Sequence, residues 1–300
     1  MIEDALRARQ LLPSDISLEE SARFYRQEHK SIVDPVRISQ AWDKYAAEVQ
    51  PMLRPRSFKS YEQAKDVLLV CVGDVPVDQV TMEAIENALK GKSAHMRNLI
   101  LRSLSPFLEY CVSHGMARSN VTKSVRRAKV PAKMPTVLSI PEVKKLLQTA
   151  ARTRPQTVAY FALGLFAGLR PDEAARIRPG HIRNGYVILD GSITKTADAR
   201  TVAIRPNLQT WLDAFPVPAN GFSVRGIKAV RSNFGAWSQD VCRHSFASYE
   251  YELTGNANAT AAQMGHLRDT DTMFRYYRAL VEPGSGKLFF AITTNILNAT

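Results

Sequence analysis

The chain has 300 residues, 45% of them hydrophobic, so it is long enough for two domains with cores of their own. Its net charge of +12 and its pI of about 9.7 favour a polyanionic partner, either nucleic acid or an anionic membrane surface. No apolar run approaches the roughly 20 residues that span a bilayer, and the N-terminus MIEDALRARQ contains acidic residues and has no apolar signal region. We therefore expect no membrane partner and a cytoplasmic location.

The three cysteines, Cys71, Cys111 and Cys242, lie far apart and show no CxxC spacing. This odd, dispersed set indicates a reducing compartment without a disulfide framework. The six histidines are also scattered, with no metal-binding spacing. We expect no metal and no other cofactor.

The first part of the chain shows helical patterns. Ser17-x-x-Glu20 is a capping box that begins a predicted helix over residues 17–26. Gly115 follows the last of four further segments with helical spacing of apolar residues, and is expected to close it. These segments predict an N-terminal helical extension over 1–33 and a helical domain over 34–121. The four segments are 38–49, 61–70, 81–89 and 95–114.

A basic segment, residues 122–135, follows this domain and contains two prolines and no acid. Prolines oppose helix continuation, and like charges favour an extended, solvated path. An ordinary surface loop has this composition too, but a linker between domains that lies against a phosphate backbone fits it better. Its cations are Lys123, Arg126, Arg127, Lys129 and Lys133.

The remainder, residues 136–300, combines helices with a small β element. Helices are predicted over 140–152 and 157–169, and the second is apolar on nearly all sides and should be buried. Asn184-Gly185 predicts a tight turn before a strand over 186–189. We also predict a hairpin in which strands 192–196 and 201–204 flank a turn. Helical patterns return from Val241, which makes this an α+β domain that is mainly helical.

An arginine stands at the end of the predicted buried helix, in the segment AGLRPDE of residues 167–173. The charge of Arg170 cannot stay unpaired beside an apolar helix, so an anion must lie close to it. A salt bridge to Glu173, three residues on, is the ordinary alternative to a bound ligand. Lys195, near the predicted β-turn, would by itself be read as a solvated lysine.

Two later segments carry further candidate residues. In DVCRHSFAS, residues 240–248, Arg243 lies near the start of a predicted helix, where a phosphate binds readily. The alternative is a helix capped by Asp240 with Arg243 in solvent. In MGHL, His266 by itself is more often a turn histidine, and the aromatics that follow at 274, 276 and 277 are more often core residues.

These residues occur in an order that resembles the tyrosine recombinase and phage integrase family. The order is an arginine, a lysine on a hairpin, Arg-His, Gly-His and a tyrosine, and Arg243 precedes His266 by the 23 residues typical of the family. The resemblance extends from about residue 34 to 285 and is strongest over 168–281. It implies a helical, SAM-like core-binding domain followed by a catalytic domain with a small β-sheet.

The resemblance also implies a role for each residue. Arg170 and Arg243 would hold the non-bridging oxygens of the scissile phosphate, where transition-state charge gathers. Tyr277 would attack phosphorus and form a 3′-phosphotyrosyl link to DNA. His266 would take its proton or hydrogen-bond to it, and Lys195 would protonate the leaving oxygen. No metal or ATP would be needed.

The implied biological setting is a site-specific recombinase of a prokaryote, phage or mobile element, acting on nucleoid DNA. Its partners would be double-stranded DNA, clamped between the two domains, and three further copies in a homotetramer that exchanges strands through a Holliday junction. The basic linker would contact DNA, and the tail after Tyr277, including 287–297, would dock on a neighbouring protomer.

Two positions depart from the family pattern. Tyr276 and Tyr277 follow His266 by 10 and 11 residues instead of about nine, and we favour Tyr277 because Tyr-Arg-Ala-Leu-Val resembles the sequence after the family's nucleophile. Asp240 stands where the family usually has histidine. A carboxylate about 4 Å from a phosphate would cost roughly 4 kcal/mol at an effective dielectric of about 20, so Asp240 is expected to cap the helix or to orient Arg243.

Two related functions remain as alternatives. A catalytically degenerate relative would bind DNA without cleaving it, which the aspartate at position 240 leaves open. An enzyme related to type IB topoisomerases would relax DNA without pairing two sites, although the helical domain over 34–121 and the short chain favour a recombinase.

Overall fold

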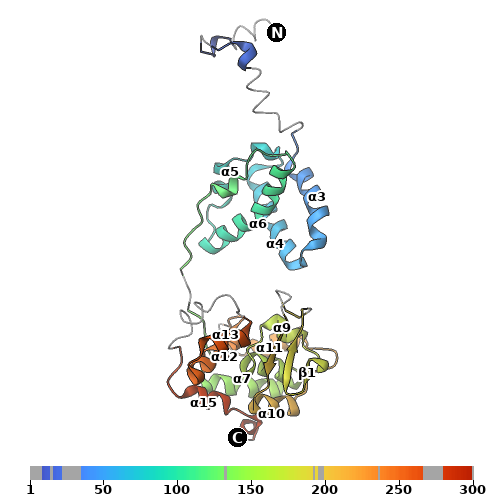
Figure 1. Ribbon diagram of the computed structural model, residues 1–300, viewed down its shortest axis with the longest axis vertical. Coiled ribbons are helices and arrows are strands. Elements are labelled where there is room, and N and C mark those ends of the chain that lie inside the picture. Colours follow the sequence, from blue (N-terminus) through green and yellow to red (C-terminus); the bar gives the residue numbers. More distant parts are fainter. Residues whose placement is uncertain are drawn as a thin grey trace. The chain divides into compact units, whose positions relative to one another are not determined.

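The computed structural model describes residues 9–13, 16–21, 35–131, 134–191, 193–194, 199–235, 237–265 and 280–298. The chain forms two compact units, unit 1 (Met1–Ala132) and unit 2 (Lys133–Thr300), drawn in Figure 1. Their division falls inside the segment predicted to be a linker. In the described residues, no helix is both long enough and apolar enough to cross a membrane.

Unit 1 is helical, and each of the four segments predicted to be helical contains a helix. The predicted capping box is also present, since Glu20 N donates to Ser17 Oγ at 3.0 Å and Ser17 N donates to the Glu20 carboxylate at 2.8 Å. The four helices are α3 (Ile38–Val49), α4 (Pro55–Val72), α5 (Met82–Ala88) and α6 (Ala94–Ser113).

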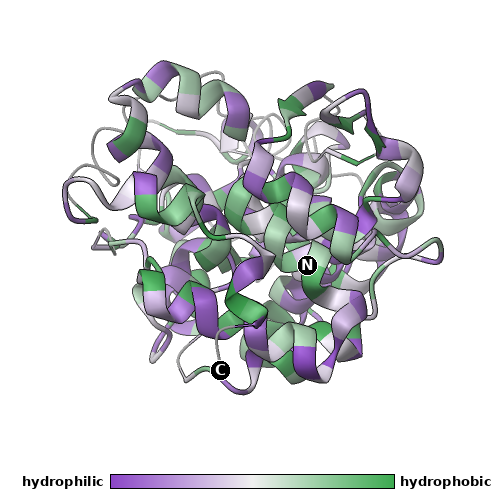
Figure 2. Cartoon of the chain, turned by 90° about the horizontal axis from the view of Figure 1, so that it is seen from below, coloured by the Kyte–Doolittle hydropathy of each residue, from purple (hydrophilic) through white to green (hydrophobic). Residues whose placement is uncertain are grey.

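An aromatic cluster forms the centre of unit 1. The Trp42 ring contacts the rings of Tyr45, Phe58 and Phe107, with centroids 5.3–6.0 Å apart. Leu68 and Ile85 are fully buried beside this cluster. Hydrophobic and hydrophilic residues alternate along the helices in Figure 2, as expected of helices that bury one face.

The first residues of the predicted linker are part of unit 1. Thr122 lies in a short 3₁₀ helix, Val121–Lys123, and is buried, as is Val125 in the core of this unit. Ala128 is held too, since its N–H donates to Asn98 Oδ1 at 2.9 Å and its carbonyl accepts from Asn98 Nδ2 at 2.8 Å. The predicted extended path therefore does not begin at residue 122.

Unit 2 is built around α8 (Val158–Phe166), in which every residue is buried, as its apolar sequence predicted. The other predicted helix is α7 (Ile140–Thr153), which begins at a capping box of Ser139 and Glu142. The short helix α9 (Pro171–Arg176) follows α8. The described part of unit 2 also contains the α-helices α10 (Pro206–Ala214), α11 (Val224–Arg231), α12 (Val241–Thr254), α13 (Ala257–Met264) and α15 (Ser285–Phe290).

A three-stranded antiparallel sheet in the order β1-β2-β3 completes the mainly helical α+β fold. Strands β1 (Ile182–Arg183) and β2 (Tyr186–Leu189) are joined by the predicted turn, in which Asn184 has φ 54° and Gly185 has φ 75°. This is the left-handed backbone that a tight hairpin requires.

The other hairpin was predicted with the wrong partner. Strand β3 (Arg200–Ala203) pairs with β2, with Leu189 opposite Arg200. Ile193 and Thr194 instead lie in a turn in which both N–H groups donate to the carbonyl of Asp190. Both side chains are buried, so these two residues pack into the core from a turn and not from a strand.

The described C-terminal segment packs on its own unit, and the docking of 287–297 on a neighbouring protomer stays a prediction. Phe289 on α15 is fully buried and stacks on the Tyr249 ring at 4.2 Å. The carbonyl of Ile292 accepts from Trp211 Nε1 at 3.1 Å, and that of Ile296 accepts from Gln148 Nε2 at 2.7 Å. The segment carries large apolar side chains because it completes this core.

Candidate active site

Arg170 lies at the N-terminus of α9, directly after the buried helix α8. Pro171 occupies the first turn, and Glu173 accepts from the backbone N–H of Arg170 at 2.9 Å and from its Nη1 at 2.8 Å. The salt bridge considered from the sequence is therefore present. The Arg170 side chain is still 31% exposed, so a ligand can reach it.

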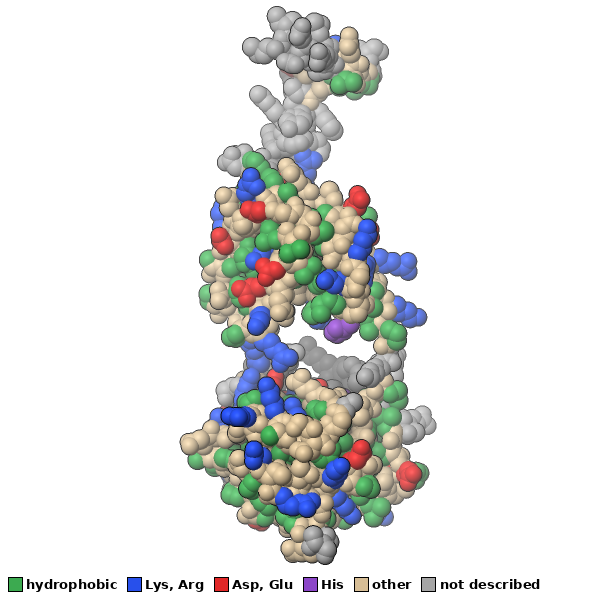
Figure 3. All heavy atoms as spheres, turned by 180° about the vertical axis from the view of Figure 1, so that it is seen from behind, with side chains coloured by type: hydrophobic (Ala, Val, Ile, Leu, Met, Phe, Trp, Pro, Cys, Tyr) green, Lys and Arg blue, Asp and Glu red, His purple; other side chains and the backbone are tan. Residues whose placement is uncertain are grey.

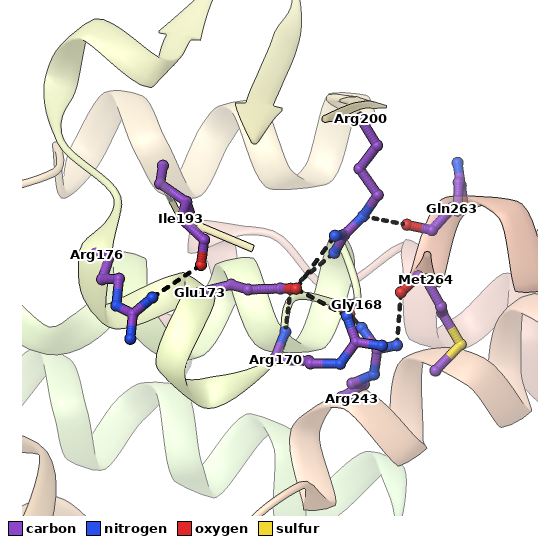
Figure 4. A network of polar contacts seen from close by, with 9 residues as sticks. All are labelled: Gly168, Arg170, Glu173, Arg176, Ile193, Arg200, Arg243, Gln263 and Met264. Carbon is purple, nitrogen blue, oxygen red and sulfur yellow. Dashed lines mark hydrogen bonds and ion pairs between the residues drawn. The ribbon is translucent and has the colours of Figure 1, made fainter. Parts of the chain in front are cut away.

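Glu173 also binds a second arginine, which sequence reasoning missed. Arg200, the first residue of β3, donates from Nη2 to Glu173 Oε2 at 2.7 Å and from Nη1 to Oε1 at 3.1 Å. The Glu173 side chain is only 2% exposed and lies between the two guanidinium groups, as Figure 4 shows. One buried acid thus joins α9 to the sheet.

The charge of this acid is determined by its neighbours. Burial of Glu173 acts to raise its pKa, but the hydrogen bonds and charge of Arg200 and the hydrogen bonds from Arg170 outweigh burial and lower the pKa to about 2. Glu173 is therefore ionised at neutral pH. A buried carboxylate with two cations and a backbone N–H is fully partnered.

Arg243, on the first turn of α12, is held by backbone carbonyls. It is 4% exposed, and it donates from Nη1 to Gly168 O and from Nη2 to Met264 O, both at 2.6 Å. Gly168 has φ +65°, and a Cβ there would overlap the Phe246 ring. The alternative in which Arg243 points into solvent is wrong, because the residue is buried between two chain segments.

The C-terminal end of α13 meets the same cluster. Arg200 Nε donates to the carbonyl of Gln263 at 3.2 Å, next to the carbonyl of Met264 that Arg243 holds. Gly265 closes the helix with φ +70°, and its absent side chain leaves room for Arg200, whose Nη1 would lie 3.1 Å from a Cβ. Arg170, Arg200 and Arg243 are thus brought together with the residues that precede His266 in sequence.

Several predicted residues lie outside the described residues. These are Lys195, His266, Tyr276 and Tyr277 of the candidate site, and Lys133 of the linker. Their predicted roles stay predictions. The flanks of Lys195 are described, and Arg176 Nη1 donates to the carbonyl of Ile193 at 3.1 Å, which ties the residues before Lys195 to α9.

Asp240 occupies the N-cap position of α12, but its carboxylate accepts no capping hydrogen bond. Only its backbone carbonyl takes part, accepting from His244 N at 2.8 Å. The expected capping role is wrong for this reason. Burial lowers the pKa of His244, and the Asp240 charge partly opposes that shift, so the carboxylate lies near enough to His244 to act electrostatically.

The linker cations of unit 1 differ in their surroundings. Lys123 pairs with Glu109 at 2.7 Å, and both side chains are largely exposed. Arg126, Arg127 and Lys129 are exposed, and none of them has an acidic partner in the described part of the chain. Basic side chains, blue in Figure 3, are also spread over the visible face of unit 2, where acidic ones are few.

Within the described ranges, no three His, Cys, Asp or Glu side chains are placed to hold a metal ion. The charged groups that the cluster offers a ligand are guanidinium groups. Such a cluster suits a phosphate, because guanidinium N–H groups match its oxygens and carry a permanent charge.

The known proteins to which the chain is similar are tyrosine recombinases and integrases. No family model matches the chain. The tyrosine recombinase XerC of Salmonella typhi is 22% identical over 269 residues, which cover 75% of this chain and 85% of that protein. A lambda integrase dimer bound to a COC′ core site aligns with a TM-score of 0.68 at 18% identity, covering 94% of this chain and 87% of the integrase. A lambda integrase tetramer bound to a Holliday junction aligns with a TM-score of 0.66 at 17% identity, covering 90% and 88%. The structural likeness establishes the fold.

Proposed function

We propose that the chain is a site-specific DNA recombinase of the tyrosine recombinase and integrase family, since it is similar in sequence to tyrosine recombinases and has the fold of lambda integrase. It cuts and rejoins DNA through a 3′-phosphotyrosyl intermediate. The observation that carries this proposal is the convergence of Arg170 and Arg243, 73 residues apart in sequence, on one segment over 168–173. Two fixed arginines beside one another can stabilise the charge that develops on a phosphate during transfer.

The proposed reaction assigns one step to each group. The phenolic oxygen of Tyr277 attacks the scissile phosphorus, and His266 accepts its proton. The bond from phosphorus to the DNA 5′-oxygen breaks, and Lys195 protonates that oxygen as it leaves. Arg170 and Arg243 balance the charge on the non-bridging oxygens. A 5′-hydroxyl of another strand then reverses these steps, so religation needs no ATP.

The assembly proposed for this chain is a homotetramer on two DNA sites, by analogy with the lambda integrase tetramer bound to a Holliday junction. Its place of action would be nucleoid DNA in the cytoplasm. The net charge of +12 supports a DNA partner, and the exposed cations at 126, 127 and 129 supply phosphate contacts outside the active site.

A nicked suicide substrate tests the chemistry, because loss of the short fragment that leaves with the free 5′-hydroxyl traps the covalent protein–DNA adduct. The wild-type protein should form the adduct in EDTA, and Tyr277→Phe should bind DNA but form none, since only the attacking oxygen is removed. Tyr276→Phe is the matched control and should retain the adduct. The reverse result for the two tyrosines would reassign the nucleophile, and DNA binding by wild type without any adduct would favour a degenerate relative.

Supercoiled DNA separates recombination from simple relaxation. A recombinase should exchange strands only between two copies of its site, which can be recovered by sequencing the DNA trapped in the adduct. Relaxation of plasmids of any sequence, without strand exchange, would favour an enzyme of the type IB topoisomerase kind.

A further inference from the structure

The cluster around Arg170 carries a net positive charge only when Arg200 is included. Glu173 contacts Arg170 at 2.8 Å and is itself buried, so its negative charge acts on that guanidinium with little screening by water. Arg170 and Glu173 alone form a neutral pair. With Arg200, which holds both carboxylate oxygens, the three side chains carry a net charge of +1.

We propose that Arg200 is a positioning residue that offsets the charge of Glu173 and so leaves the charge of Arg170 available to the scissile phosphate. The proposal rests on the proposed recombinase function. Arg200 would not touch the DNA. It acts through Glu173, and its contact with the carbonyl of Gln263 fixes it between α9 and α13.

The geometry in Figure 4 supports this role over a purely structural one. Glu173 already has a partner in Arg170 and a backbone donor in the same turn, so burial alone does not require a second arginine. Arg200 is 13% exposed at its side chain, whereas Arg170 is 31% exposed. The less accessible arginine neutralises the acid, and the more accessible one is left to meet a ligand.

Unit 2 contains a second buried glutamate paired with an arginine, and this pair serves as a matched control. Arg205 donates from Nη2 to both carboxylate oxygens of Glu250 at 2.7 Å, and its guanidinium lies over the Phe290 ring at 4.4 Å. Glu250 is 5% exposed. None of the hydrogen bonds of this pair involves Arg170, Glu173 or Arg243. Its loss should therefore affect stability but not the charge at the active site.

The test measures single-turnover cleavage of the suicide substrate at saturating protein. Arg200→Met should slow cleavage about 50-fold, the factor given by one unbalanced charge about 7 Å from the phosphate at an effective dielectric of about 20. Arg200→Lys, which keeps the charge, should stay within about fivefold of wild type. In Glu173→Gln/Arg200→Met the unbalanced charge is gone, so cleavage should recover to within about fivefold of wild type.

The double variant separates an electrostatic role of Arg200 from a structural one. If Arg200 had only a structural role, the losses of cleavage caused by the two substitutions would add. A double variant no faster than Arg200→Met would overturn the proposal, as would Arg200→Lys with the same loss as Arg200→Met or Arg200→Met at the wild-type rate. Arg205→Met should lower Tm yet cleave near the wild-type rate, and an equal loss of cleavage at equal Tm would attribute the Arg200 effect to stability. Absence of any wild-type adduct would instead overturn the proposed function.

Discussion

Arg243 on α12 donates to the carbonyl oxygen of Gly168, 2.6 Å away, although 75 residues separate them in the chain. The same guanidinium holds the carbonyl of Met264 at the end of α13. One buried side chain therefore connects three segments that the sequence marks as chemically important. Its orientation depends on the backbone of Gly168, and any side chain at position 168 would disturb that backbone.

Gly168→Ala should destabilise unit 2 and disturb Arg243. A positive φ costs a non-glycine residue about 1 kcal/mol, and the overlap with Phe246 should add about 1–3 kcal/mol. Urea unfolding measures the loss. Gly255→Ala is the matched control, because Gly255 has φ +62° but nothing within 4 Å of an added Cβ, so only the backbone cost should appear. Equal losses in the two variants would contradict the overlap with Phe246.

Glu173 should make stability depend on pH at the acid end. Its pKa falls from an ordinary value of 4.5 to about 2 on folding, so the ionised form stabilises the native state above pH 4.5. That contribution, on the order of 3 kcal/mol, should be lost as pH falls from about 4.5 to 2. The free energy of unfolding measured against pH should show this slope in wild type and a smaller one in Glu173→Gln. Identical slopes would mean that Glu173 titrates alike in both states.

Local patterns predicted the helices well, because each carries its own periodicity and end signals. The capping box at Ser17 and the apolar helix α8 appear where the sequence placed them. The Asn184-Gly185 turn is also local, since its positive φ angles follow from these two residue types. Such features need no knowledge of the rest of the chain.

Contacts between distant segments could not be predicted in this way. Arg200 read as a turn residue because its neighbours 197–199 are small or polar, and nothing local pairs it with Glu173, 27 residues away. The partner of β3 was wrong for the same reason, as several segments could supply a strand. The packing of Phe289 in the core of unit 2 was not predicted either, because no local pattern shows which core receives it.

The linker cations should affect binding and not the chemical step. Replacing Arg126, Arg127 and Lys129 together with alanine should weaken binding to every DNA sequence, and the slope of log affinity against log salt should shrink by up to about 0.9 for each lost phosphate contact. Fluorescence anisotropy over a salt series measures both. Lys123→Ala should change the slope less, because its ammonium already pairs with Glu109. An unchanged slope in the triple variant would remove this segment from the DNA interface.

Asp240 is one of the two positions where the chain departs from the pattern of tyrosine recombinases, and the structure alters what its replacement should do. Its carboxylate does not cap α12, and the described hydrogen bonds of Arg243 run to Gly168 and Met264. Removing the carboxylate should therefore leave Arg243 in place. It should also remove a negative charge that opposes a bound phosphate.

We accordingly expect Asp240→Ala to cleave at least as fast as wild type at matched DNA occupancy. Asp240→His, which adds a hydrogen-bond donor at the start of α12, should be faster by up to about tenfold. Single-turnover rates on the suicide substrate decide between these expectations and a positioning role. Losses of about a hundredfold in both variants would mean that the carboxylate orients Arg243 once DNA is bound, since neither variant retains an acid at this position.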